Sequence, residues 1–172
     1  HLRLVNNVMR ARSNRTAWKP FLNTRLSGLD EISRDLDLID SDDSAVETGL
    51  VALRRVVEPI AGTPWLTDMG ASKMLYLLRP RFVPISDSYV RALLGVPDAP
   101  VGAPRLIAVA RGIRAVGHQN MSALATLADF IRSTDRVKPK AGKFAGNSIP
   151  LTLSKARILD ILLWTQQAIQ GP

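Results

Sequence analysis

The 172-residue chain contains no cysteine, and this absence excludes both a disulfide framework and any zinc or iron–sulfur site that cysteine thiolates would hold. Histidine is almost as scarce. The two histidines are His1, at the start of the chain, and His118, and no histidine-based triad or metal constellation can be assembled from them. We therefore expect a protein that uses no metal ion and no cofactor.

Long apolar runs are also missing. The longest uninterrupted ones, such as 161–164, extend over a few residues, whereas a helix that crosses a bilayer needs about 20. The chain does not open with the charged, apolar and small-residue pattern of a secretory leader. We expect a cytoplasmic protein that does not enter a membrane. Because the chain opens at His1 rather than at a methionine, we also expect the native start to lie upstream.

Strand signals are nearly absent, because no run shows a clean alternation of apolar and polar residues. Helical start signals recur instead: Ser44 and Glu47 have the spacing of a capping box, and Ser27 and Asp30 resemble one. We expect an all-α fold, organised as a single globular multi-helix domain over residues 1–172. The expected helices cover residues 17–25, 29–38, 44–57, 66–78, 88–94, 105–116, 122–132 and 153–168.

The charge balance is strongly basic, with 23 Lys and Arg against 15 Asp and Glu and a net charge of +8. Such a balance favours an anionic partner such as a nucleic acid. The Gly- and Pro-containing loop 134–150 gathers basic side chains around Phe144 and is the best candidate for a phosphate-binding surface, the alternative being a loop that is only solvated. Its basic residues are Arg136, Lys138, Lys140 and Lys143.

The expected helix 66–78 raises a question about one lysine. On a helical wheel Met69, Met74 and Leu77 define an apolar face, and Lys73 falls within the same arc. We expect this helix to be largely buried. An unpaired ammonium in that position would be costly to desolvate, so Lys73 needs a partner or a route to water.

Asp87 is the nearest candidate partner for Lys73, because the intervening turn could fold it back beside the lysine. An alternative is that Asp87 or Ser86 caps the short helix 88–94 while the Lys73 side chain extends along the surface to water. Both interpretations are compatible with the sequence.

Four stretches between Met69 and Gly95 carry a resemblance to a known superfamily. They are Met69-Gly70-Ala71-Ser72-Lys73-Met74-Leu75, the Arg79-Pro80 turn, Pro84-Ile85-Ser86-Asp87-Ser88-Tyr89-Val90, and Leu93-Leu94-Gly95. Together they resemble a segment of the helix-hairpin-helix DNA glycosylase superfamily. They resemble still more closely a small uncharacterised bacterial family with the same arrangement of lysine helix, turn and aspartate. The resemblance implies an all-helical fold of the glycosylase type.

In the glycosylases, an aspartate that opens a helix in an Asp-x-x-Val context stabilises the cationic sugar or activates the attacking species after the damaged base is flipped out. The resemblance implies this role for Asp87, with Tyr89 at the position often held by histidine and Val90 anchoring the helix. The implied protein binds DNA, acts in base excision repair and hydrolyses an N-glycosidic bond with Asp87, Lys73 and Tyr89 as its catalytic residues. The implied nucleic-acid contacts are Gly70, Ser72, Arg79 and Arg81, beside the basic residues of the loop.

Two departures from the superfamily pattern leave other functions open. The hairpin that usually reads Leu-Pro-Gly-x-Gly is Leu66-Thr67-Asp68-Met69-Gly70 here, and with one glycine and no proline it is less suited to bring backbone amides against a phosphate. Lys73 is also too near Asp87 in sequence for the Schiff-base lysine of the bifunctional enzymes, so hydrolysis is expected rather than a lyase step. The alternatives are a non-catalytic nucleic-acid-binding protein and a protein-interaction module whose acidic segment, 30–47, meets a basic partner.

The expected helix 153–168 is apolar on nearly every side yet contains Asp160. A carboxylate in such a helix needs a partner, and Arg157, one turn earlier, is the nearest cation. We favour this structural pairing over a catalytic role for Asp160. The three tryptophans stand among apolar neighbours, and packing in the core is the favoured interpretation for Trp18, Trp65 and Trp164, with a place at a cleft as the alternative for Trp65.

Overall fold

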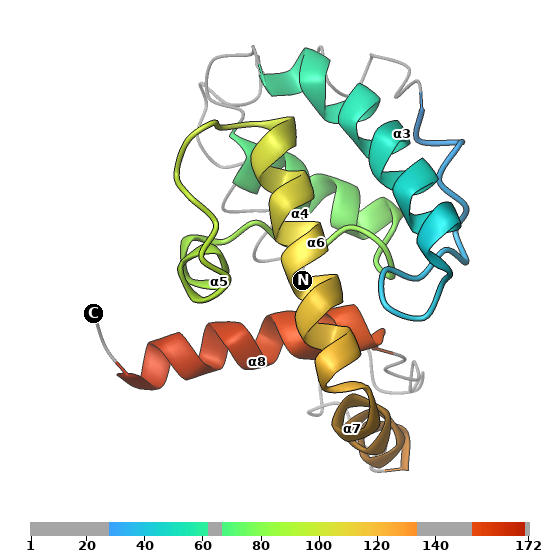
Figure 1. Ribbon diagram of the computed structural model, residues 1–172, viewed down its shortest axis with the longest axis vertical. Helices are drawn as coiled ribbons and strands as arrows, with labels where there is room; N and C mark the ends of the chain where they lie inside the picture. The colour runs from blue at the N-terminus through green and yellow to red at the C-terminus, as the bar shows by residue number, and fades with distance from the viewer. Residues whose placement is uncertain (1–27, 62–66, 134–152, 171–172) are drawn as a thin grey trace, which may run out of the picture.

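The computed structural model describes residues 28–61, 67–133 and 153–170 of the chain (Figure 1). Every regular element in these ranges is an α-helix, which confirms the expected all-α class. None of these helices combines the length and the apolar character that crossing a bilayer demands. The expected helix 17–25 and Ser27 lie outside the described residues. The helices are α3 (Asp43–Ala61), α4 (Asp68–Leu78), α5 (Ser88–Leu93), α6 (Ala103–Gln119), α7 (Met121–Ser133) and α8 (Lys155–Gln170).

Helix α6 lies at the centre of the fold and packs against α3, α4, α7 and α8. Figure 1 shows α8 crossing the lower half of α6, with the short helix α5 above the C-terminal half of α8. Helix α5 packs against α8 as well. Residues from the middle of the sequence therefore meet residues near its C-terminal end, and this meeting builds the cavity of the candidate site.

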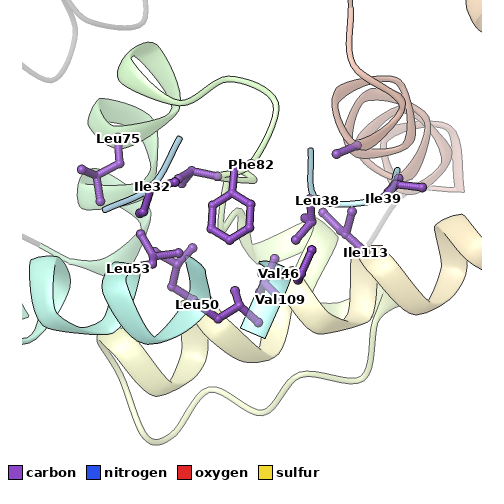
Figure 2. Close-up of a cluster of buried hydrophobic side chains, with 14 of the residues drawn as sticks. Ile32, Leu38, Ile39, Val46, Leu50, Leu53, Leu75, Phe82, Val109 and Ile113 are labelled. Atoms are coloured by element: carbon purple, nitrogen blue, oxygen red, sulfur yellow. The ribbon is translucent and has the colours of Figure 1, made fainter. Parts of the chain in front are cut away.

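The hydrophobic core contains Phe82, which lies in the turn after α4 and is 1 % exposed. Figure 2 shows its ring in one cluster with Ile32, Leu50 and Leu53. Gly49 of α3 makes room for the ring, because a Cβ at that position would stand 2.6 Å from Phe82 Cζ. This close approach fixes the turn after α4 against α3, and the same turn leads on to Asp87.

Residues 29–38, which we expected to be helical, form turns instead. Short polar side chains in and after this segment compete with a helix for backbone N–H groups. Asp37 Oδ1 accepts the N–H of Ile39 at 2.9 Å, and Ser41 Oγ accepts the N–H of Asp37 at 2.9 Å. Leu38 and Ile39 are nevertheless buried, so the apolar pattern indicated burial correctly but the wrong backbone conformation.

Helix α3 begins one residue earlier than expected, and a different residue caps it. Asp42 Oδ1 accepts the N–H of Ala45 at 2.8 Å, so Asp42 holds the capping position that the sequence pattern assigned to Ser44. Glu47, the expected second member of the capping box, instead pairs with Arg111 of α6 at 2.7 Å. The expected capping box is therefore wrong, although the helix it predicted is present.

Helix α4 buries a different face from the one we expected. Leu77 is 46 % exposed, whereas Leu75 is fully buried together with the polar residues Asp68 and Ser72. The expectation of a buried Met69 to Leu77 face is wrong because Asp68 and Ser72 find hydrogen-bond partners inside the protein and can turn inward. Lys73 is consequently only partly buried.

Candidate functional site

Ser86, the residue before Asp87, belongs to a group of four buried or half-buried residues that we call the Ser86 cluster: Asp68, Ser72, Ser86 and Arg105. The N–H of Ser86 donates to Ser72 Oγ at 2.9 Å, and its hydroxyl donates to Asp68 Oδ2 at 2.8 Å. Arg105 of α6 donates from Nε to the same carboxylate oxygen at 2.8 Å and from Nη2 to Oδ1. The Ser86 cluster ties α4, α6 and the turn before α5 together, and this sets the position of Asp87.

Asp68 remains ionised although its side chain is fully buried. Burial alone would raise its pKa, but the hydrogen bonds from Arg105 and Ser86 and the positive charges of Arg105 and Arg91 outweigh this effect. The pKa of Asp68 therefore lies below its ordinary value of 3.8. The Ser86 cluster is a satisfied structural unit.

Asp87 caps helix α5. Its Oδ1 accepts the N–H of Tyr89 at 3.0 Å, and its backbone is extended, as is usual at a helix N-cap. This contact confirms the capping interpretation for Asp87. Among the described residues, none donates a hydrogen bond to Asp87 Oδ2. One oxygen of the carboxylate is therefore held, and the other is available to a ligand or a water molecule.

Asp87 and Lys73 line the same cavity, which has a volume of about 400 Å³ and lies between α4, the turn before α5 and α8. No ion pair joins the two side chains in the described part of the chain. The expected pairing is thus not formed, and both charges face the cavity rather than closing a core. The other described residues that line the cavity are Ile85, Arg157, Asp160, Ile161 and Trp164.

Asp160 forms the pair that the sequence predicted, because its Oδ2 accepts from Arg157 Nη1. The pairing does not outweigh desolvation. Burial, the largest effect, and the negative charge of Asp87 raise the pKa of Asp160, whereas Arg157 lowers it, and the net result is a pKa of about 6. The Arg157 guanidinium also lies over the ring of Tyr76, 5.0 Å from its centroid. The cavity therefore holds a second carboxylate that can carry a proton near neutral pH.

The arrangement suits acid–base and electrostatic chemistry. Two carboxylates, Asp87 and Asp160, and two cations, Lys73 and Arg157, lie beside the aromatic ring of Trp164. Within the described ranges, no group of three or more His, Cys, Asp or Glu side chains is placed to hold a metal ion.

Two further expected site residues, Tyr89 and Arg81, do not line the cavity. Tyr89 is 45 % exposed on α5 and does not line the cavity. Arg81 is exposed on the surface, where its Nε lies 3.3 Å from Asp37 Oδ2. The basic loop residues Arg136, Lys138, Lys140 and Lys143 lie outside the described residues.

Three expected nucleic-acid contacts have structural roles instead. The N–H of Gly70 donates to Thr67 Oγ1 at 3.2 Å in the N-cap of α4, and Ser72 is buried in the Ser86 cluster. Arg79 is 6 % exposed, and its guanidinium donates to backbone carbonyls that include Ile32 O at 2.6 Å. These donors already have partners inside the protein, and the assignment of Gly70, Ser72 and Arg79 to phosphate binding stays a prediction.

Asp160 and Trp164 are among the cavity residues that were not expected at a site. The sequence pattern favours a structural role for Asp160 and places Trp164 in the core, but Trp164 is 48 % exposed and lines the cavity. The one sequence feature that could have indicated a site here is Asp160, a carboxylate on an otherwise apolar helix. Nothing in the sequence indicated that α8 would meet the turn before α5. Trp18 and Trp65 lie outside the described residues.

Comparison with known proteins places the chain in a family. A family of unknown function, DUF6308, matches residues 19–167. No curated protein and no solved structure matches the chain. Since the family match covers most of the chain and includes every residue that lines the cavity, the protein belongs to the DUF6308 family.

Proposed function

We propose that the protein is a DNA glycosylase-like enzyme that binds a nucleic acid and hydrolyses the N-glycosidic bond between a base and its sugar. One observation carries the proposal: Asp87 and Lys73 line a cavity of about 400 Å³ together with Trp164. This volume is typical of small-molecule sites, and an aromatic wall beside charged groups suits a base flipped out of a duplex. The proposal includes membership of the helix-hairpin-helix DNA glycosylase superfamily and a role in base excision repair.

In the proposed reaction, Asp87 provides the negative charge beside the sugar. Breaking the C1′–N bond develops positive charge on the sugar, which a fixed carboxylate stabilises electrostatically, and the same group can take a proton from the attacking water. The Tyr89 N–H fixes Asp87 Oδ1 at 3.0 Å, and Oδ2 accepts no hydrogen bond from the described residues. The Ser86 cluster holds the adjoining backbone, so the carboxylate needs little rearrangement to act.

Substrate binding is assigned to Lys73 and Trp164. The Lys73 ammonium forms no ion pair with any described residue, so it is available to a phosphate beside the flipped nucleotide. Trp164, together with Ile85 and Ile161, supplies an apolar wall on which a base can stack. The net charge of +8 and the exposed Arg81 support attraction of the nucleic-acid backbone.

The direct test is the release of free base from oligonucleotides that carry common lesions. Asp87→Asn should keep the helix cap, because asparagine caps as well as aspartate, but should lower the single-turnover rate of base release by about 10²-fold or more. Asp42→Asn is the matched control, since Asp42 also accepts an N–H in the first turn of a helix, at 2.8 Å, and does not line the cavity. Equal release by the wild type and Asp87→Asn across a broad lesion panel would contradict the catalytic role.

A second candidate is a non-catalytic nucleic-acid-binding protein on the same scaffold. The observation that favours it is the position of Tyr89, one of the three implied catalytic residues, which is 45 % exposed and does not line the cavity. A titration with labelled duplex and single-stranded DNA at increasing salt distinguishes the candidates when it is combined with the release assay. Binding that weakens steeply with salt but never leads to base release would support the second candidate. Absence of binding at low salt would contradict both.

A further inference from the structure

The proposed role of Asp87 leaves the second carboxylate of the cavity, Asp160, without a function. The Asp160 side chain is 5 % exposed, and its Oδ2 accepts from Arg157 Nη1. No described residue donates to its Oδ1, and this atom is not among the polar atoms that are both fully buried and unpartnered. Oδ1 is therefore the open position of this carboxyl group, and Asp160 lines the cavity.

The titratable groups around Asp160 come from three parts of the structure. Arg157, on the same helix, holds Oδ2 and lies over the ring of Tyr76 from α4. Asp87, from the turn before α5, and Lys73, from α4, line the same cavity. Helices α6 and α7 also pack against α8, but none of their described titratable groups lines the cavity. Burial and the charge of Asp87 favour a proton on Asp160, and Arg157 opposes it.

We propose that Asp160 is a further catalytic residue of this cavity, the acid that donates a proton from Oδ1 to the departing base. This inference rests on the function proposed for Asp87. Two carboxyl groups in one cavity allow separate acid and base roles in the same reaction when one of them carries a proton and the other does not. Asp87 faces the sugar or the water, and Asp160 faces the leaving group.

The proposed step adds one water molecule across one bond. The C1′–N bond breaks and its electron pair stays with the base, which receives the proton of Asp160. The water oxygen forms the new bond to C1′ and passes a proton to Asp87. Exchange with solvent then returns a proton to Asp160 and removes one from Asp87, so the enzyme is restored without any further reactant.

The test compares two kinds of leaving base. A neutral base such as uracil or hypoxanthine leaves as an anion unless it is protonated, whereas 7-methylguanine is cationic in DNA and leaves as a neutral molecule. Asp160→Asn should therefore slow release of the neutral base by about 10²-fold or more and leave release of 7-methylguanine within about threefold of the wild type. Asp129→Asn is the matched control, because Asp129 pairs with Arg132 at the same i,i+3 spacing, in the opposite order, but is exposed on α7 and outside the cavity.

The pH dependence of the wild type provides a readout that does not depend on the folding of any variant. Release of the neutral base should fall as the pH rises through about 6, and release of 7-methylguanine should not follow this change. Equal slowing of both bases in Asp160→Asn, or a pH-independent rate for the neutral base, overturns the donor role while the proposed function stands. Release of 7-methylguanine alone by the wild type overturns it in the same way. If the wild type releases no base at all, the proposed function and the donor role both fail.

Discussion

Asp68 and Asp160 are both buried aspartates that pair with an arginine, yet their pKa values move in opposite directions. The Asp68 side chain is 0 % exposed and that of Asp160 is 5 % exposed. The pKa of Asp68 lies below 3.8, whereas the pKa of Asp160 is raised to about 6. Burial alone cannot account for this difference, because it acts in the same direction on both groups.

The difference lies in what surrounds each carboxylate. Asp68 accepts from two nitrogens of Arg105 and from the hydroxyl of Ser86. Asp160 accepts from a single arginine nitrogen and has the negative charge of Asp87 nearby. A carboxylate whose two oxygens both accept hydrogen bonds stabilises the fold. A carboxylate beside a cavity, with one oxygen that accepts no hydrogen bond, can take up and release a proton. The same residue type thus serves structure in one place and, in our proposal, chemistry in the other.

The largest expected effect comes from breaking the structural pair. Arg105→Met should lower the free energy of unfolding by about 3–5 kcal/mol at neutral pH, because it leaves the buried Asp68 charge without its main partner. The stabilisation that depends on the low pKa of Asp68 is present above pH 3.8 and is lost as the pH falls through the folded-state pKa. The difference in unfolding free energy between the wild type and Arg105→Met should therefore become smaller in acid. Chemical denaturation at several pH values measures both effects. A loss below about 1 kcal/mol would show that Asp68 does not depend on this arginine.

A smaller effect is expected from the second pair. The pKa of Asp160 is raised from 3.8 to about 6 in the folded state, so the stability that comes from binding this proton is fully present below pH 3.8 and is lost as the pH rises through about 6. Relative to Asp160→Asn, the wild type should lose up to about 3 kcal/mol of unfolding free energy across that interval. Denaturation curves of the two proteins from acid to neutral pH provide the comparison. Stability profiles that run parallel would refute the raised pKa.

Much of the fold followed from sequence because local signals specify helices. The apolar spacing of α3 and the Asp87 cap of α5 gave two helices close to their observed positions. The prediction of a helix over residues 29–38 was wrong for a physical reason. The apolar residues of this segment are buried or half-buried as their pattern indicated, but Asp37 and Ser41 accept backbone N–H groups in turns rather than in a helix. Apolar periodicity predicts burial. It predicts the backbone conformation only where polar side chains do not compete for the backbone hydrogen bonds of a helix.

The candidate site was predictable only in its local part. Asp87 could be selected because a capping aspartate at the start of a short helix is a local pattern. The cavity was not predictable, because Asp160 and Trp164 reach it through the packing of α8 against α5, a contact between distant segments. The burial of the Arg79 side chain was not predictable for the same reason, since two of the carbonyls that it contacts, those of Leu29 and Ile32, lie far earlier in the chain.

Carboxyl carbon NMR titrations of the wild type and of Asp87→Asn test most directly whether the cavity holds two coupled carboxylates. The Asp160 signal, assigned by its loss in Asp160→Asn, should titrate near pH 6 in the wild type and at a lower pH in Asp87→Asn, because removing the Asp87 charge removes one cause of the raised pKa. The Asp68 signal should titrate below pH 3.8 in both proteins. An Asp160 signal that titrates near 3.8 and does not respond to Asp87→Asn would contradict the assignment of this cavity as a reactive site.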